Sequence, residues 1–364
     1  MSVNAYICSN MRATILFLLA IFLCNCTHKK TPHYGWESLG KGLNNLPSTL
    51  AIYKDELYVC GDFDSAGDVK TDLIARWNGQ RWASLGKGVK PINDEDAEIS
   101  IIAMQVFDDK LWVSGTFDSI GNVPARYVAQ WDGASWDTLG GGLNSLINVF
   151  TIYKGKLIAA GYFNKGYGKS MNFIVQWNNN NKRWEPLGEG VSDYIYALCV
   201  YQGRLYVGGQ FKNAGGIAVH NIASWNGSTW HEVGGGVDRP IENMWIFNDR
   251  LYVSGDFSRV GNLSVNSLAS WDGRNWADAT ELKDIYEMTS DNPIRFALKY
   301  IVEDNLKSHD SILEYNGKVW YRILPSGNIG NLAYYKGYLY GIGLFDSIGS
   351  VKARNIVKCK VDSL

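Results

Sequence analysis

Proline, histidine and an excess charge of either sign are all scarce in this sequence. It has 8 prolines and 5 histidines among 364 residues, and 35 Lys and Arg balance 36 Asp and Glu. A chain without a basic field or an acidic tail is not expected to bind nucleic acid. After residue 26 there is no Cys-x-x-Cys or His-x-x-x-His spacing, so we expect no metal and no other cofactor.

Catalytic motifs are also missing. The sequence contains no Gly-x-Ser-x-Gly elbow and no phosphate-binding glycine loop, so it identifies no catalytic residue. The segment from Asp62 to Asp68 contains several side chains with oxygen atoms, as a calcium-binding loop does. Other units of the chain place Lys212 where this one has Asp64, which a calcium site would not tolerate, so we interpret the segment as a turn.

The apolar run near the N-terminus, residues 13–23, is too short to span a bilayer. It follows Arg12 and ends next to Cys24 and Cys26, a pattern typical of a secretory signal. The arrangement resembles a bacterial lipoprotein signal, and Cys26 fits the acylated cysteine best, with Leu23 three positions before it. A plain signal peptide is the alternative. Met11 would make a good signal start, so we hypothesise that translation begins there and that residues 1–10 are not part of the precursor.

These features predict a domain plan and a location. Residues 1–25 are the expected signal peptide, residues 26–34 a lipid-anchored tether, and residues 35–364 the folded domain. The resemblance implies an outer-membrane lipoprotein of a Gram-negative cell envelope, attached to the membrane through its acyl chains. Which side of the membrane it faces stays open.

Six cysteines could form a disulfide set, but their positions argue otherwise. Cys8 and Cys24 fall in the expected signal, and Cys26 is the expected anchor. The other three, Cys60, Cys199 and Cys359, occupy repeat positions where other units carry Gly, Ser, Trp or apolar residues. We therefore expect them to be small buried side chains with free thiols.

A tryptophan recurs through the rest of the chain at intervals of 44 to 54 residues, at Trp36, Trp82, Trp136, Trp184, Trp230, Trp276 and Trp320. In the fourth unit, residues 195–201, 205–211 and 221–225 alternate like strands, and a further strand starts at Trp230. Turns such as Asn226-Gly227 join them. Repeats of this length built from four strands are typical of a β-propeller.

The ends of the chain predict how the ring closes. The last unit has three strands, and residues 35–39 form an orphan fourth strand at the beginning. We therefore expect an all-β, seven-bladed β-propeller of four-stranded antiparallel blades, closed by pairing of the N- and C-terminal strands. Six blades with an irregular segment around the sixth unit is the competing count, because Tyr315 replaces a tryptophan there and residues 284–305 lack the repeat signature.

Glycine recurs in the second strand of the repeat, as in Gly61 and Gly209. A glycine inside a strand marks a close approach of another backbone, which we expect where blades converge near the axis. The tryptophans should then fill the wider outer gaps between sheets.

Three segments carry a family resemblance: Trp-x-x-Leu-Gly-x-Gly, Leu-Tyr-Val-Gly-Gly-x-Phe and Asn-Ile-Ala-x-Trp-Asn-Gly-x-x-Trp. They resemble repeats of secreted bacterial propellers and of fungal cortical polarity-marker proteins. More distantly, they are similar to kelch repeats and to the propeller of galactose oxidase. The resemblance implies the fold but no activity, since the copper ligands of the oxidase find no match here.

Ligands of propellers usually bind in the loops that enter the innermost strands. In this sequence those loops vary from unit to unit while the strands do not, which makes them candidate ligand-face residues. The candidates are Asp94, Glu95, Asp96, Asp193, Tyr194, Asp238 and Arg239.

The sequence favours a non-enzymatic role. We expect an envelope-anchored binding or scaffold propeller with a protein or glycan ligand. One alternative is a glycan hydrolase or lyase, which would need two convergent carboxylates in the central opening. Another is a structural subunit of an envelope complex, which would show a large apolar patch on one rim.

Overall fold

Short strands joined by tight turns build the described part of the chain, which contains no α-helix. The computed structural model describes residues 35–361, except 87–88, 91–99, 140–141, 280–281, 283–284, 289–295, 303–307, 316–319 and 325–327. Cys26, Asp94, Glu95 and Asp96 therefore lie outside the described residues. Among the residues that are described, none forms a helix of the length and apolar character needed to cross a membrane.

The described residues form seven four-stranded sheets, and every strand pair within them is antiparallel. This confirms the all-β class and the four-stranded antiparallel repeat expected from the sequence. The sheets are numbered here in chain order, with the strand that begins each sheet given first. They are sheet 1, β2 (Pro47–Tyr53), β3 (Glu56–Gly61), β6 (Ile74–Trp77) and β7 (Trp82–Ser84); sheet 2, β9 (Ile101–Phe107), β10 (Lys110–Gly115), β13 (Val128–Trp131) and β14 (Trp136–Thr138); sheet 3, β15 (Ile147–Tyr153), β16 (Lys156–Gly161), β19 (Ile174–Asn178) and β20 (Arg183–Pro186); sheet 4, β21 (Ile195–Tyr201), β22 (Arg204–Gly209), β25 (Ile222–Trp225) and β26 (Trp230–His231); sheet 5, β27 (Asn243–Phe247), β28 (Arg250–Ser254), β31 (Leu268–Trp271) and β32 (Trp276–Asp278); sheet 6, β33 (Ile285–Met288), β34 (Phe296–Val302), β35 (Ser308–Tyr315) and β36 (Trp320–Leu324); and sheet 7, β37 (Asn328–Tyr335), β38 (Tyr338–Leu344), β41 (Ile356–Lys360) and β1 (Trp36–Ser38).

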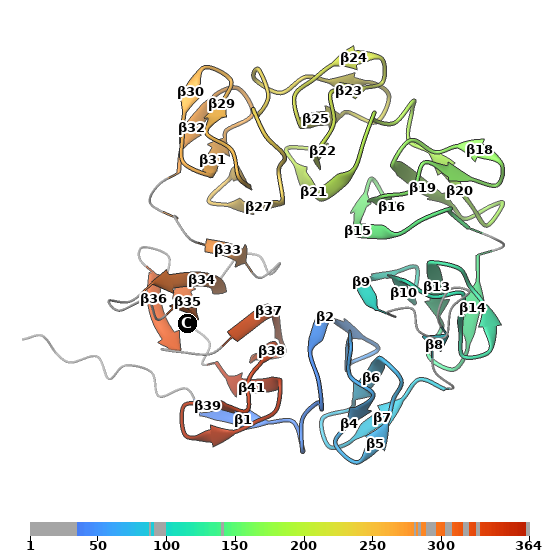
Figure 1. The fold of residues 1–364 in the computed structure, drawn as a ribbon, viewed down its shortest axis with the longest axis vertical. Helices are drawn as coiled ribbons and strands as arrows, with labels where there is room; N and C mark the ends of the chain where they lie inside the picture. Colours follow the sequence, from blue (N-terminus) through green and yellow to red (C-terminus); the bar gives the residue numbers. More distant parts are fainter. Residues whose placement is uncertain are drawn as a thin grey trace, which may run out of the picture. The chain divides into compact units, whose positions relative to one another are not determined.

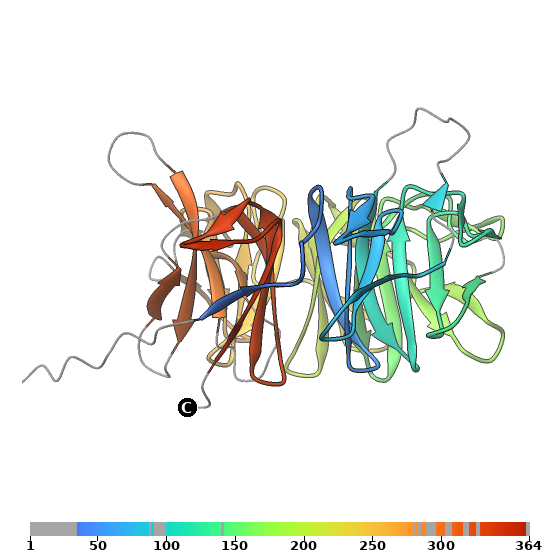
Figure 2. The same cartoon turned by 90° about the horizontal axis from the view of Figure 1, so that it is seen from below.

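The first strand of each sheet lies nearest a central axis (Figure 1). Successive first strands contact one another, from β2 to β9, β15, β21, β27, β33 and β37, and β37 contacts β2. The strands cross the molecule from one face to the other, as the view in Figure 2 shows.

A small two-stranded hairpin follows the second strand in six of the sheets. The hairpins are β4 (Ser65–Ala66) with β5 (Val69–Lys70), β11 (Ser119–Ile120) with β12 (Val123–Pro124), β17 (Lys165–Gly166) with β18 (Lys169–Ser170), β23 (Asn213–Ala214) with β24 (Ile217–Ala218), β29 (Arg259–Val260) with β30 (Leu263–Ser264), and β39 (Ser347–Ile348) with β40 (Val351–Lys352). An additional strand, β8 (Val89–Lys90), pairs with β11. In each sheet, the first strand begins at the end where the second strand finishes. We call this end of the sheets the hairpin face.

Backbone hydrogen bonds join neighbouring sheets at this face, as two examples show. The Val191 N–H donates to the Asn172 carbonyl of sheet 3, and the Ser192 N–H donates to the Asn213 carbonyl of sheet 4. Val237 and Asp238 repeat this pattern between sheets 4 and 5. The Gly-x-Gly segments at residues 188–190 and 234–236 thus lead into fixed connections whose backbone polar groups are paired.

The recurrent strand glycine does face a close backbone, as the sequence predicts, but the neighbour is not the expected one. A Cβ on Gly209 would collide with the Tyr194 carbonyl oxygen and the Ile195 Cα, and Gly61 faces Leu46 and Pro47 in the same way. Both neighbours belong to the first strand of the same sheet, where the register shifts by one residue. The cause is therefore a β-bulge within a sheet and not the convergence of blades.

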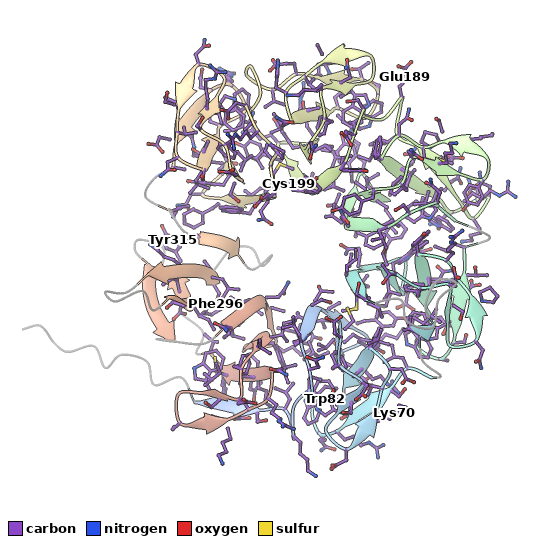
Figure 3. All side chains as sticks on the ribbon, viewed as in Figure 1. Lys70, Trp82, Glu189, Cys199, Phe296 and Tyr315 are labelled. Atoms are coloured by element: carbon purple, nitrogen blue, oxygen red, sulfur yellow. The ribbon has the colours of Figure 1, made fainter. Side chains whose placement is uncertain are left out.

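The tryptophans lie between sheets, as expected. Trp77 and Trp82 of sheet 1 pack 5.1 Å apart in a cluster that includes Ile342 and Ile356 of sheet 7. The Trp82 indole N–H donates to the Leu39 carbonyl at 2.8 Å; Figure 3 labels Trp82. Cys60, Cys199 and Cys359 are free and buried, which confirms their interpretation as small core residues.

Sheet 7 combines both ends of the described chain. Residues 36–38 of β1 pair with residues 357–359 of β41. The Asn355 amide donates to the carbonyls of Leu43 at 3.1 Å and Asn45 at 3.0 Å, between sheets 7 and 1. Asp55 of sheet 1 accepts a hydrogen bond from the Tyr335 hydroxyl and forms a salt bridge of 3.0 Å with Lys336.

Sheet 6 departs from the repeat in the pairing of its second and third strands. β34 and β35 pair along their whole length, from Phe296 opposite Glu314 to Val302 opposite Ser308. Tyr315 packs edge-on against Phe247 of sheet 5, with ring centroids 5.0 Å apart. The side chain that replaces the repeat tryptophan therefore still fills the space between sheets.

Candidate ligand-binding face

Four aromatic side chains gather on the hairpin face where sheets 3 and 4 meet. Tyr162 lies edge-on to Tyr194, with ring centroids 4.8 Å apart, and to Tyr196, at 6.2 Å. Phe173 contacts Tyr194 edge-on at 5.7 Å. We call Tyr162, Phe173, Tyr194 and Tyr196 the aromatic patch.

Exposure distinguishes this patch from every other aromatic group that the structure describes. Tyr162 is 37% exposed and Tyr194 is 39% exposed, and they are the only aromatic residues among the exposed large apolar side chains of the described residues. The repeat tryptophans that are described fully are mostly buried. The two exposed tyrosines are therefore not needed to fill the gaps between sheets.

Strand ends hold the patch in place. Tyr162 directly follows Gly161 at the end of β16, and its N–H donates to the Leu146 carbonyl at 3.0 Å. The Tyr194 carbonyl accepts the Gln210 N–H at 2.8 Å, and Asp193 Oδ1 accepts the Tyr194 N–H at 2.9 Å. These bonds fix the backbone beneath both exposed rings.

Phe173, just before β19, has a left-handed backbone conformation that recurs at the same place in other sheets, as at Leu73 and Tyr127. Its φ is +68°, in the left-handed region that a bulky residue rarely occupies. Asn221, at the same place in sheet 4, uses its amide to donate to the Val237 carbonyl at 2.8 Å. A phenylalanine cannot make that bond, so the conformation costs about 1–3 kcal/mol that its side chain does not recover through hydrogen bonding.

A polar rim surrounds the rings. The Tyr196 hydroxyl donates to Gln210 Oε1 at 3.3 Å. Burial raises the pKa of Tyr196, and Tyr162, Asp193, Tyr194 and Glu242 raise it further. Asp193 precedes Tyr194 in the chain, and Glu242 comes from the connection that enters sheet 5, where the Ile241 N–H donates to the Gly209 carbonyl of sheet 4 at 3.3 Å.

The patch is specific to one pair of sheets. The same backbone hydrogen bond that positions Tyr162 places Asp62 in sheet 1, Thr116 in sheet 2 and Gln210 in sheet 4. The bonding partner equivalent to Tyr194 is Leu46 in sheet 1, Ser100 in sheet 2 and Leu146 in sheet 3. The fold requires an aromatic ring at neither position.

The structure brings two of the sequence candidates, Asp193 and Tyr194, into the patch. Asp238 instead fastens a hairpin: Oδ1 accepts the N–H groups of Ser258 at 3.1 Å and Arg259 at 3.0 Å, and Oδ2 accepts the Ser258 hydroxyl. Arg239 forms a salt bridge of 3.0 Å with Asp256. Asp238 and Arg239 thus take part in contacts within sheet 5.

Asn44, Asn144 and Ser192 hold the hairpins of sheets 1, 3 and 4 in the same way as Asp238, each accepting two backbone N–H groups. Asn, Ser and Asp all supply a suitable oxygen for this task. Part of the variation between loops therefore reflects interchangeable capping residues, not ligand choice.

Sequence reasoning missed Tyr162, Phe173, Tyr196, Gln210 and Glu242. One signal was available for Tyr162, because it is the only aromatic residue among those that follow the recurrent strand glycine. Glu242 carried no such signal, since only the three-dimensional arrangement brings it near sheet 4.

A second concavity, of about 210 Å³, lies where sheets 7 and 1 meet. Asn44, Asn45, Asp346, Arg354 and Asn355 supply most of its polar lining. The amide of Asn355 is already used to join the two sheets. Within the described residues, no group of three or more His, Cys, Asp or Glu side chains could hold a metal ion.

No protein-family model and no curated protein matches this sequence. Among solved structures, a chain in the crystal structure of the mitotic checkpoint complex is 11% identical, with a TM-score of 0.50; the match covers 90% of this chain and 95% of that one. The β-propeller domain of the Trilobed protease from Pyrococcus furiosus is 9% identical, with a TM-score of 0.45 over 86% and 92% of the two chains. Polysaccharide lyase Uly1 is 13% identical, with a TM-score of 0.45 over 89% and 91%.

At these identities the likeness concerns the fold alone. Four-stranded antiparallel sheets, set around an axis with their first strands in mutual contact, define a β-propeller. The protein belongs to that structural class, and the sheets are its blades.

Proposed function

We propose that this protein is a binding propeller whose ligand-contacting surface is the aromatic patch on the hairpin face. The observation that carries the proposal is the mutual contact of Tyr162 and Tyr194, each more than a third exposed in a molecule whose other described aromatic rings are more buried. Tyrosine supplies a large rigid contact area at low entropic cost, and it is enriched where binding energy concentrates. The ligand would be a protein or a glycan.

Seven blades in a closed ring are part of this proposal. Its support is the pairing of β1 with β41 and the contacts of Asn355, Tyr335 and Lys336 with the first blade. A closed ring would supply the fourth strand of sheet 7 and would hold the hairpin face rigid.

We also propose that the protein acts in the cell envelope of a Gram-negative bacterium, as an outer-membrane lipoprotein. Its support is the sequence: a signal at residues 1–25, acylation at Cys26 and a polar tether over residues 26–34. Mass spectrometry of the mature protein from membranes tests this. A diacylglycerol-modified Cys26 is the expected result, and an unmodified N-terminus produced by cleavage elsewhere would contradict it.

The binding role is tested by capture from native envelope extract, combined with a glycan array. The full chain should retain a specific ligand, and the Tyr162→Ser/Tyr194→Ser variant should lose it at an unchanged melting temperature. Leu46→Asn is the matched control, because Leu46 occupies the position of Tyr194 in the first blade and is 40% exposed. Equal capture by the wild type and the tyrosine variant would contradict the proposal.

The same experiment separates the two alternatives that the sequence left open. A glycan hydrolase or lyase would release shortened products from an array-positive polysaccharide. A structural subunit would be captured in a fixed complex that survives loss of both tyrosines.

A further inference from the structure

The aromatic patch lies beside two carboxylates, those of Asp193 and Glu242. Asp193 Oδ1 accepts the Tyr194 N–H at 2.9 Å, and the Ile241 N–H, which precedes Glu242, donates to the Gly209 carbonyl at 3.3 Å. Neither carboxylate forms a salt bridge with a lysine or arginine of the described residues. The faces of the tyrosine rings add to this negative character, because an aromatic ring carries negative potential on its faces.

The opposite face of the molecule shows what such an arrangement holds. There, the Lys54 ammonium lies 5.2 Å from the Tyr53 ring centroid and 3.4 Å from Asp109. The Lys336 ammonium lies 5.2 Å from the Tyr335 ring and 3.0 Å from Asp55. In both places a tyrosine and an aspartate share one lysine, and the lysine joins neighbouring sheets.

The patch at Tyr162 and Tyr194 has the tyrosines and the carboxylates of these sites. What it lacks, within the described residues, is a lysine in a salt bridge with Asp193 or Glu242. The rings also meet at steep angles, 79° between Tyr162 and Tyr194 and 64° between Tyr162 and Tyr196, so they enclose a corner and do not form a flat stack.

We propose that the aromatic patch binds a lysine or arginine side chain of a basic protein partner, with Tyr162 and Tyr194 against the cation and Asp193 and Glu242 beside it. This inference rests on the binding role proposed above and names the chemistry of the ligand. An uncharged sugar could donate hydroxyl hydrogen bonds to the two carboxylates, but only a cation also gains the attraction between opposite charges and the attraction to the ring faces.

A side chain projecting from a protein fits better than a small free cation. The two tyrosines remain more than a third exposed, so the patch is a surface and not an enclosing pocket. A protein partner would supply further contact area around the cation, with the tyrosines as the central anchors.

The test uses two synthetic peptides and the whole mature chain. The first peptide is acetyl-Gly-Lys-Gly-Lys-Gly-amide, and the second replaces both lysines by norleucine, which keeps most of the length and removes the charge. We expect the lysine peptide to bind at least about tenfold more tightly. Its affinity should fall as salt rises, because part of the attraction is between partly exposed charges.

Two variants separate the contributions. Asp193→Asn/Glu242→Gln should weaken the lysine peptide several-fold and flatten its salt dependence, while the norleucine peptide is unaffected. Tyr194→Leu should weaken the lysine peptide more strongly. Asp256→Asn is the control, since Asp256 is exposed, occupies the position of Tyr162 in sheet 5 and is already paired with Arg239.

Equal binding of the two peptides would overturn the inference, as would no binding of the lysine peptide up to about 10 mM. Binding of choline without binding of the lysine peptide would overturn it in favour of a small quaternary cation. If envelope capture needs the tyrosines but the lysine peptide fails, the binding role stands and only the cationic ligand is wrong. If capture ignores the tyrosines, both proposals fail.

Discussion

At the scale of single residues, one polar side chain before the first strand of sheets 1, 3, 4 and 5 fastens the hairpin of the same sheet. Each of four different side chains accepts two consecutive backbone N–H groups at the equivalent place of its own hairpin. They are Asn44, Asn144, Ser192 and Asp238. The position therefore selects an oxygen acceptor on a short side chain, and the identity of the residue is secondary.

Replacing Asp238 by alanine should lower the free energy of unfolding by about 1–2 kcal/mol, because it leaves the N–H groups of Ser258 and Arg259 without their acceptor. Asp238→Asn should stay close to the wild type, since Asn44 and Asn144 already perform this role. Urea denaturation measures both variants. An alanine variant as stable as the asparagine variant would show that water replaces the carboxylate at no cost.

A second residue-scale prediction concerns acid stability. The backbone N–H groups of Ser135 and Ala134 hold the pKa of Asp132 below its ordinary value of 3.8, and those of Asn275 and Arg274 act likewise on Asp272. A carboxyl whose folded pKa is lowered stabilises the protein above its unfolded pKa and loses that contribution as the pH falls through the folded pKa.

As the pH falls below 3.8, the free energy of unfolding of the Asp132→Asn/Asp272→Asn variant should therefore decrease less than that of the wild type. Asparagine already serves in the same turn at Asn78 and Asn226, so the turns should survive the change. Melting curves recorded at descending pH are the measurement. Parallel pH profiles for both proteins would contradict the assignment.

At the scale of elements, the periodicity of the sequence predicts the strands of the four-stranded sheets well. It predicts the small two-stranded hairpins poorly. The alternation of residues 195–201 predicts the observed bounds of β21, and Asn226-Gly227 correctly marks the turn from β25 to β26. The sequence does not predict the hairpin of β23 and β24, because two-residue strands are too short to show a period. Its stability comes from the bonds to Ser192 and Val191, which are tertiary contacts.

The residues of the candidate site also fall into two groups, those that the sequence predicts and those that it does not. Tyr194 and Asp193 were found because they lie in a loop before a first strand, which the repeat identifies. Phe173 and Glu242 come from other connections, and their approach to Tyr194 and Tyr196 depends on how sheets 3, 4 and 5 are set side by side. No spacing in the sequence encodes that neighbourhood.

The β-bulge opposite Gly209 leads to a prediction at the scale of elements. Gly209→Ala should destabilise the protein by about 1–3 kcal/mol or more, because the added methyl group would meet the Tyr194 carbonyl and the Ile195 Cα. Gly330→Ala is the matched control, since a Cβ there would meet nothing within 4 Å. Thermal unfolding compares the two. The prediction is wrong if both variants melt with the wild type.

At the scale of the whole molecule, sheet 7 depends on a strand from the other end of the chain. Deleting residues 31–42 removes β1 and Leu39, which is fully buried and accepts the Trp82 indole N–H. We expect the melting temperature to fall by about 5–10 °C, since each kcal/mol lost is worth about 2–4 °C in a large domain. The exposed edge of β41 should also promote self-association.

Deletion of residues 27–34, which leaves β1 in place, is the control for this experiment. Differential scanning calorimetry and light scattering follow the two properties. A melting temperature shared by both deletion proteins would show that β1 adds nothing to the ring.

The pairing of residues 36–38 with residues 357–359 also sets the order of events when the protein is made. β1 has no partner until residues 357–359 have been synthesised. Every nascent chain therefore carries β1 unpaired up to that point, and joining β1 to β41 carries the entropic cost of a very long loop. A prematurely terminated product would keep that strand unpaired, which gives a quality-control protease a simple way to recognise it.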